Sequence, residues 1–153
     1  MKVFVTVGTT TFDSMIAHID QLDIPDVSFT LQIGPSNYKP KKYPYFEFSN
    51  RIEQEYLDAD CVISHCGAGS TYRLLELGKP LILVPNLERV DKHQSDLAQF
   101  VQNNNYAHVA WQVTSIGEKI SLVKNVEKPL TPFSKTPFFY AEHLQSLVRN
   151  SLL

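Results

Sequence analysis

Cysteine is scarce in this chain, which holds only Cys61 and Cys66 among its 153 residues. Two cysteines do not make a disulfide framework, and we expect one in a buried strand and the other in a turn, both reduced in a cytoplasmic protein. No apolar run is long enough to span a bilayer. The short apolar run after Lys2 is interrupted by Thr6 and Gly8, too early for a signal peptide, so none is expected.

An excess of charge of either sign is also missing, because the formal net charge is -2 at pH 7 and only 20% of the residues are charged. This balance argues against a nucleic-acid-binding protein that works by bulk electrostatics. A hydrophobic content of 43% is ordinary for a soluble globular protein. The length fits one domain with a real core, so we expect a single domain over residues 1–153.

Apolar periodicity predicts strands that alternate with helices. The predicted strands lie near 3–7, 27–33, 45–48, 61–64, 81–84 and 107–111. The predicted helices lie near 12–19, 52–57, 72–77, 93–101 and 116–123. This alternation indicates an α/β fold with a mainly parallel sheet. Three prolines in residues 127–137 predict a tether, and residues 138–153 predict a C-terminal helix whose apolar stripe packs on a core or docks on a partner.

Local signals sharpen some of these boundaries. Thr10 with Asp13, and Ser115 with Glu118, have the spacing of capping pairs at two helix starts. Residues 34–44 form a loop rich in proline, lysine and tyrosine. This loop is either a solvated connection or a basic-aromatic contact for a partner protein or an anionic membrane surface.

Two strand–glycine turn–helix units carry most of the polar chemistry. The first turn holds Gly8, Thr9 and Thr10, and the second runs from His65 to Thr71. In a parallel sheet both turns could meet at one carboxyl edge, where such sheets bind ligands. Glycine permits close approach to backbone N–H groups, and a helix N-terminus favours an anion. The second turn therefore predicts a phosphate site through His65, Gly67, Gly69, Ser70 and Thr71, although an empty tight turn has the same pattern.

A second polar segment, residues 86–94, follows the apolar run 81–84. Its donors and acceptors suit sugar hydroxyls, with a solvated loop as the alternative. The residues that we single out here are Asn86, Asp91, His93 and Gln94.

Metal and nucleophilic chemistry have weaker support. His65, Cys66 and His93 are the only visible ligand candidates, and they lack the paired spacing of zinc sites, so no metal is expected. A nucleophilic pair of Cys66 and His93 lacks an evident third group to orient it. No pair of carboxylates stands out at a strand end. The catalytic residues stay unassigned, with His65 and His93 as candidates.

The segment VISHCGAGSTYRLLELGKPLILVP followed by DKHQSDLA resembles the carboxyl-terminal half of the family 28 glycosyltransferases. The opening VFVTVGTTTFDSMI is similar to the start of the small catalytic subunits of split transferases. In eukaryotes such a subunit adds the second N-acetylglucosamine to a dolichol-linked glycan. Bacterial relatives act in exopolysaccharide and capsule assembly with a membrane-anchored partner.

The resemblance implies one Rossmann-like domain, equivalent to the donor-binding half of a GT-B glycosyltransferase. It implies a donor that is commonly a UDP-sugar, and no cofactor or metal. Carried over to this sequence, Gly8, Thr9 and Thr10 match the family's first loop. The turn that faces phosphate corresponds to His65, Gly67, Gly69, Ser70 and Thr71. The segment that touches the donor sugar corresponds to Asn86, His93 and Gln94.

One position departs from the family pattern. Many relatives carry an acidic residue that can bind the ribose hydroxyls where this chain has Arg73. Glu76 lies three residues further along a helix that advances about 100° per residue, so it does not simply substitute. The resemblance therefore implies either that Arg73 contacts phosphate or an acidic sugar, or that another residue holds the ribose.

The sequence thus predicts a glycosyltransferase subunit that binds a UDP-sugar. With a membrane-anchored, acceptor-binding partner it would transfer the sugar to a lipid-linked acceptor, as a cytoplasmic protein held at the membrane by that partner. Two alternatives stay open: a non-catalytic module that binds a nucleotide sugar, and a different α/β nucleotide enzyme such as an epimerase.

Overall fold

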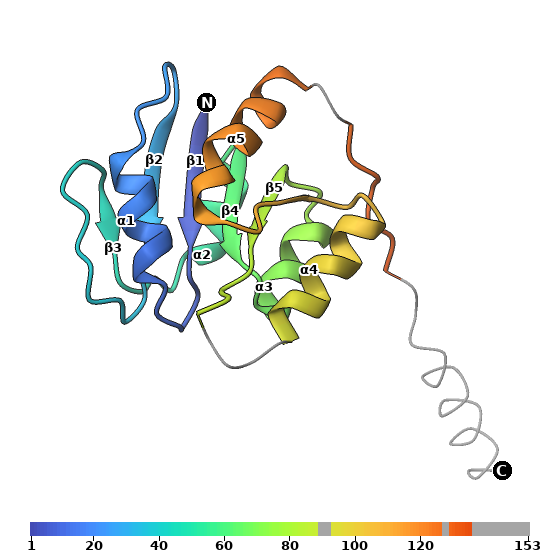
Figure 1. Cartoon of the computed structure of the whole chain (residues 1–153), viewed down its shortest axis with the longest axis horizontal. Helices are drawn as coiled ribbons and strands as arrows, with labels where there is room; N and C mark the ends of the chain where they lie inside the picture. Colours follow the sequence, from blue (N-terminus) through green and yellow to red (C-terminus); the bar gives the residue numbers. More distant parts are fainter. Residues whose placement is uncertain (89–92, 127–128, 136–153) are drawn as a thin grey trace, which may run out of the picture.

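A parallel β-sheet forms the centre of the molecule, which we describe from a computed structural model over residues 1–88, 93–126 and 129–135 (Figure 1). Within these residues the sheet has six strands in the order β3-β2-β1-β4-β5-β6. The strands are β1 Lys2–Thr6, β2 Ser28–Gln32, β3 Tyr45–Phe46, β4 Cys61–His65, β5 Leu81–Val84 and β6 His108–Val109. The helices are α1 Asp13–Gln21, α2 Ile52–Asp58, α3 Ala68–Glu76, α4 His93–Asn103 and α5 Ile116–Asn125, the last preceded by a short 3₁₀ turn, Val113–Ser115. The expected α/β class with a parallel sheet is confirmed.

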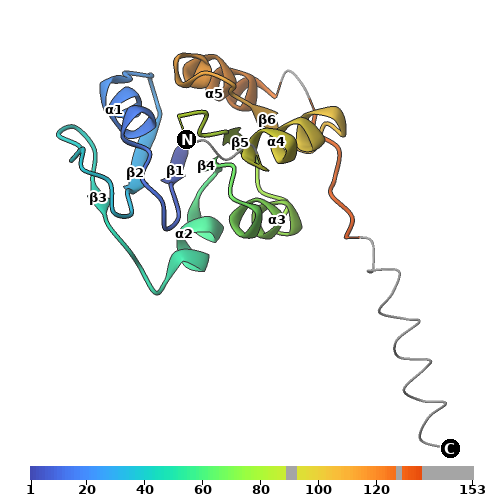
Figure 2. The ribbon, with the colours of Figure 1, turned by 60° about the horizontal axis from the view of Figure 1, so that its bottom comes forward.

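Helices cover both faces of the sheet, as Figure 2 shows for α1 and α5 on one side and α2 and α3 on the other. Side chains alternate along each strand, so Val3 and Val5 of β1 pack with α1 and α5, while Phe4 packs with α2 and α3. In β5, Ile82 and Val84 pack in the core beside α1 and α5, and Leu81 and Leu83 pack in the core beside α2 and α3. Every residue of β5 is buried. The central strands have no polar face because each of their two faces is buried in an apolar core.

The strand order reverses between β1 and β4. From β1 the chain proceeds to β2 and β3 on one side of the sheet, and from β4 to β5 and β6 on the other. Thr6 and Ser64 are paired at the carboxyl ends of β1 and β4, so the turns that follow start side by side. The two glycine turns meet at one edge, as the sequence predicted, and this edge is the topological switch point of the sheet.

Three local predictions were wrong. Neither α1 nor α5 has the side-chain cap that its sequence suggested, because Phe12 precedes α1 and the Ser115 hydroxyl donates to the Gln112 carbonyl. Asp13 instead accepts a hydrogen bond from the Tyr38 amide, at 3.2 Å. Helix α3 begins at Ala68, four residues earlier than the apolar pattern indicated, since glycine and hydroxyl residues in its first turn hide the periodicity. The predicted helix 138–153 lies outside the described residues.

The loop 34–44 is tied to the domain by one buried carboxylate. Asp20, 7% exposed, accepts hydrogen bonds from the amides of Lys41 (2.8 Å) and Lys42 (2.9 Å) and from the Tyr38 hydroxyl (2.9 Å). Burial would raise the pKa of the Asp20 carboxyl, but these hydrogen bonds outweigh burial and hold its pKa below its ordinary value. Lys42 is also paired with Asp23 at 3.2 Å. The loop is therefore an ordered connection that Asp20 holds against the domain.

We expect Asp20→Ala to lower the free energy of unfolding by about 2–3 kcal/mol, because it leaves three part-buried donors without their charged acceptor. Urea denaturation followed by circular dichroism measures the change. The matched control is Asp23→Ala, whose carboxylate is 94% exposed and pairs with the same loop. That control should cost about 0.5 kcal/mol or less, as surface ion pairs do. Equal losses in both variants would contradict the role given to Asp20.

The same carboxylate predicts a pH dependence. Its folded-state pKa lies below the unfolded reference of 3.8, so its stabilisation is complete above about pH 5 and is lost as the pH falls through the folded-state value. The stability difference between the wild type and Asp20→Asn should therefore be constant from pH 7 to about pH 5 and shrink at lower pH. Urea midpoints measured along a pH series test this. A difference that stays constant down to pH 2 would contradict it.

Candidate functional site

A cavity of about 510 Å³ opens at the switch point, between the ends of β1 and β4 and the starts of α3 and α4. Five of the residues singled out in the sequence line it: Thr10, His65, Gly67, His93 and Gln94. The other described residues that line it are Cys66, Ala68, Tyr72, Leu97 and Phe100. Both glycine turns and the start of α4 therefore contribute to a single cavity, although they lie far apart in the sequence.

The imidazole of His65 determines how the two turns fit together. A Cβ atom placed on Gly8 would lie 2.7 Å from His65 Cε1, and one placed on Gly67 would overlap the same ring at Nε2. Gly8 also has φ +60°, a conformation that favours glycine. His65 is only 5% exposed. The ring is therefore packed between the two turns, and both glycines are required by the shape of the site before any ligand binds.

Two buried polar residues that the sequence analysis missed hold the first turn in place. Gln32 donates from Nε2 to the carbonyls of Gly8 and Glu47, at 2.8 Å each, and its Oε1 accepts from the Thr6 hydroxyl. The Gly8 amide in turn donates to Thr6 Oγ1 at 3.1 Å. Gln32 ends β2, where Ser28 and Thr30 alternate with Phe29 and Leu31, so the sequence pattern alone placed its side chain with the polar residues of the strand.

The start of α3 is presented to the cavity without a side-chain cap. Its N-cap residue is Gly67, and the first intrahelical bond runs from the Thr71 amide to the Gly67 carbonyl at 2.9 Å. The amides before Thr71 have no partner within the helix. Gly69 is exposed, and a Cβ on it would meet nothing within 4 Å, so the space above it is open. This end of α3 can therefore donate to an anion.

The hydroxyls of that turn are placed differently. Thr71 is buried beneath the helix, and the Ser70 hydroxyl lies beside the phenol of Tyr56. Burial raises the pKa of Tyr56, and the Ser70 and Thr6 hydroxyls partly offset this. Thr9 is exposed at the first turn. Among these predicted contacts, the backbone of α3 is thus better placed for a ligand than the side chains of Ser70 and Thr71.

Cysteine and metal chemistry have little support at this site. Both cysteines are unpaired and buried, and burial raises the pKa of the Cys66 thiol to about 12, although the Thr71 hydroxyl lowers it slightly. A thiol held protonated is a poor nucleophile. In residues 1–88, 93–126 and 129–135, no group of three or more histidine, cysteine or acidic side chains could hold a metal ion.

In the polar segment after β5, some residues hold the loops together and others line the cavity. Asn86 is buried, its Nδ2 donates to the Thr11 carbonyl at 3.1 Å, and its Oδ1 accepts from the Glu88 amide at 3.2 Å. The Asn86 amide donates to Gln94 Oε1 at 2.9 Å. Asn86 therefore joins this segment to the first turn, while His93 and Gln94 face the cavity from α4. Asp91 lies outside the described residues.

Arg73 faces away from the cavity, toward α2. Its Nε and Nη2 form a bidentate ion pair with Glu53, at 2.9 and 2.8 Å, and its Nη1 lies 4.0 Å from Glu76. The hydrogen bonds and the negative charge of Glu53 raise the pKa of the Arg73 guanidinium above its ordinary value. Of the two possibilities left open for this position, the geometry favours the one in which another residue holds a ribose.

The strand order and a cavity at the reversal point define a Rossmann-like α/β domain of the ligand-binding class. Residues 2–137 match the Glycosyltransferase family 28 C-terminal domain. This chain therefore belongs to that glycosyltransferase family, as the resemblance implied.

Named relatives agree with this assignment. The UDP-N-acetylglucosamine transferase subunit ALG13 of Mus musculus is 31% identical over 137 residues, which are 80% of this chain and 12% of the relative. The Homo sapiens protein of the same name is 37% identical over 111 residues, 63% of this chain and 10% of the relative. The chain thus spans less than an eighth of the length of each of these two relatives.

Solved structures support the fold. The NMR solution structure of ALG13 matches with a TM-score of 0.57 and 21% identity, over 88% of this chain and 90% of that one. MurG of Acinetobacter baumannii matches with a TM-score of 0.60 and 18% identity, over 83% of this chain and 41% of that one. The expected Rossmann-like half of a GT-B enzyme is confirmed as a fold. Within the described residues, none of the helices has the length and apolarity needed to cross a bilayer.

The packing of His65 predicts opposite results for two glycines in the same turn. Gly67→Ala should lower the free energy of unfolding by about 1–3 kcal/mol, because the new methyl group displaces the imidazole. Gly69→Ala, in open space inside α3, should leave stability unchanged or raise it by about 0.5–1 kcal/mol. Thermal and urea unfolding measure both. Equal destabilisation by the two alanines would contradict this account.

Proposed function

We propose that this chain is a glycosyltransferase subunit that binds a UDP-sugar in the switch-point cavity. The observation that carries the proposal is the convergence of two glycine turns, an uncapped helix start and the His93–Gln94 pair on that cavity. The relatives named as UDP-N-acetylglucosamine transferase subunits support the same donor class. UDP-N-acetylglucosamine is therefore the first donor to test.

The diphosphate would lie against the start of α3. The amide groups of residues 68–70 and the positive end of the helix dipole favour an anion there, and the absence of side chains at Gly67 and Gly69 permits close approach. As the bond to the sugar breaks, negative charge develops on the leaving diphosphate. Fixed backbone donors would stabilise that charge, so we propose a reaction without a metal ion.

The sugar would lie toward α4. His93 can donate to or accept from sugar hydroxyls, and Gln94 can donate from Nε2 while its Oε1 accepts from the Asn86 amide. The His65 imidazole closes the floor of the cavity between them and the first turn. The described lining contains imidazoles and no carboxylate. The base that activates an acceptor hydroxyl would thus be His65, His93 or a group on a partner chain.

The acceptor half of the enzyme would come from a second chain. We propose a membrane-anchored, acceptor-binding partner that brings a lipid-linked acceptor to the carboxyl edge of the sheet. This subunit would then act at the cytoplasmic membrane face, in polysaccharide or oligosaccharide assembly. The relatives' description as subunits supports a partner.

A binding test addresses the donor site on this chain alone. Calorimetry with UDP should detect binding, and Gly69→Ala should weaken it about tenfold or more because a methyl group would occupy the space of the diphosphate. The matched control is Gly117→Ala on α5, where a Cβ has an ordinary contact of 3.9 Å with Leu22. Gly117→Ala should bind UDP as the wild type does. Wild-type affinity in Gly69→Ala would exclude diphosphate binding at this helix start.

Transfer requires the partner. The complex with the membrane-anchored subunit should transfer sugar from a UDP-sugar to a lipid-linked acceptor, with EDTA present, and His93→Ala should reduce the rate by about 10²-fold if His93 is the base. A complex that binds UDP-N-acetylglucosamine but transfers no sugar from any UDP-sugar tested would favour the alternative, a non-catalytic nucleotide-sugar-binding module. That alternative is favoured by one observation, the lack of a carboxylate in the described lining.

A further inference from the structure

Residues 129–135, here called the strap, follow α5 and run along the edge of the domain past the end of α4 (Figure 1). The Thr131 amide donates to the Asn105 carbonyl at 2.8 Å, and Asn105 Nδ2 donates to the Pro129 carbonyl at 3.0 Å. Lys135 is paired with Glu76 of α3 at 2.9 Å. The segment expected to be a tether is thus attached to the domain along its described length.

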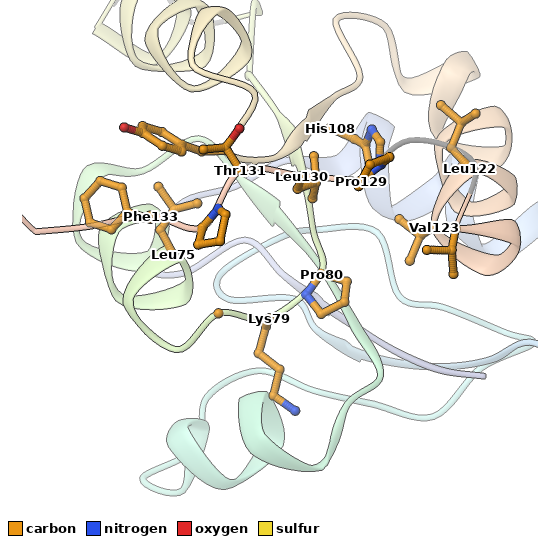
Figure 3. Close-up of a pocket in the computed structure, with 14 residues that line it drawn as sticks. Leu75, Lys79, Pro80, His108, Leu122, Val123, Pro129, Leu130, Thr131 and Phe133 are labelled. Atoms are coloured by element: carbon orange, nitrogen blue, oxygen red, sulfur yellow. The ribbon is translucent and has the colours of Figure 1, made fainter.

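A cavity of about 310 Å³ lies under the strap, at the edge of the sheet opposite the candidate site. Figure 3 shows Phe133 and Leu75 at one end of this strap cavity, Val123 at the other, and Pro80 between them. Side chains that line a cavity have no packing partner on that side. The strap is therefore held mainly at a few contacts, and its local opening should cost less than global unfolding.

Four aromatic rings connect the strap with the candidate site. Phe133 of the strap contacts Tyr106 edge-on, with ring centroids 5.2 Å apart, and contacts Tyr72 at 6.1 Å. Tyr106 contacts Phe100 at 6.0 Å. Tyr72 and Phe100 line the switch-point cavity, whereas Phe133 and Tyr106 line the strap cavity. The two cavities thus share one aromatic wall, with Phe133 in its middle.

We propose that Phe133 is a positioning residue for the donor site and acts through Tyr72. Tyr72 is 41% exposed and projects from the second turn of α3, so the Phe133 ring supports the side that does not face the cavity. Aromatic pairs hold one another in edge-to-face or offset geometries. Removal of the Phe133 ring leaves Tyr72 free to leave the cavity wall.

The inference rests on the proposed function, and it names the part of the donor that the wall contacts. Tyr72 and Phe100 share the cavity with His93 and Gln94, the proposed sugar contacts. An aromatic wall at that place packs against the apolar face of the donor sugar. The backbone donors proposed to hold the diphosphate belong to the first turn of α3, one turn before Tyr72, so they do not move with the Tyr72 ring.

Thermodynamic linkage adds a second consequence. If Phe133 favours donor binding, donor binding must stabilise the closed strap by the same factor. The state of the strap is then coupled to occupancy of the donor site.

The first experiment compares UDP with UDP-N-acetylglucosamine by calorimetry on the full chain. Phe133→Ala should weaken the binding of UDP-N-acetylglucosamine about fivefold or more and leave UDP affinity unchanged. Phe133→Tyr keeps the ring and should restore binding. Leu130→Ala, which lines the strap cavity outside the aromatic contacts, should bind both ligands as the wild type does. Phe133→Leu keeps apolar bulk and replaces the alanine variant if that variant unfolds.

The second experiment measures hydrogen exchange at the Thr131 amide, which reports strap opening. UDP-N-acetylglucosamine should slow this exchange in the wild type and not in Tyr72→Ala. The effects of Tyr72→Ala and Phe133→Ala on sugar-nucleotide binding should also be non-additive, since Phe133 acts through Tyr72. Additive effects, or equal protection in Tyr72→Ala, would overturn the inference.

The outcomes separate this inference from the proposed function. If the wild-type chain binds neither UDP nor UDP-N-acetylglucosamine, the proposed function fails and the inference fails with it. If the wild type binds both ligands and Phe133→Ala binds them equally well, the inference alone is overturned.

Discussion

The close packing of the His65 imidazole between Gly8 and Gly67 is the constraint on which the site depends. It joins the turns after β1 and β4, which are paired along their strands, into one surface at the reversal point of the sheet. Gln32 and Thr6 fix the first turn from below, and Asn86 joins the segment after β5 to the same turn. The cavity floor is therefore set by packing inside the protein.

Helix α3 relates this site to the rest of the domain. Its uncapped start faces the switch-point cavity, and its other end, through Leu75, lines the cavity under the strap. Between the two ends, Tyr72 contacts Phe133 and Arg73 contacts Glu53. One short helix thus carries an anion-binding end, an aromatic wall and an ion pair to α2.

Sequence patterns predicted the elements better than their ends. The apolar strands were identifiable because burial on both faces leaves them without polar residues, as in Leu81–Val84. Helix α3 began earlier than predicted because Gly69, Ser70 and Thr71 carry no apolar periodicity. The predicted cap of α1 was wrong because Asp13 accepts from the Tyr38 amide, a partner that local sequence rules cannot detect. The predicted cap of α5 was wrong because the Ser115 hydroxyl donates to the nearby Gln112 carbonyl.

The sequence by itself determined the α/β class and the two glycine turns, because these follow from periodicity and from backbone requirements. Only the tertiary structure decided which polar side chains face the cavity. Asn86 and Arg73 read as ligand contacts, yet each is committed to a partner from another element, Thr11 and Glu53 respectively. The aromatic wall also joins residues far apart in the chain, from Tyr72 to Phe133. Pairing across the fold depends on three-dimensional distance, and no spacing along one segment encodes it.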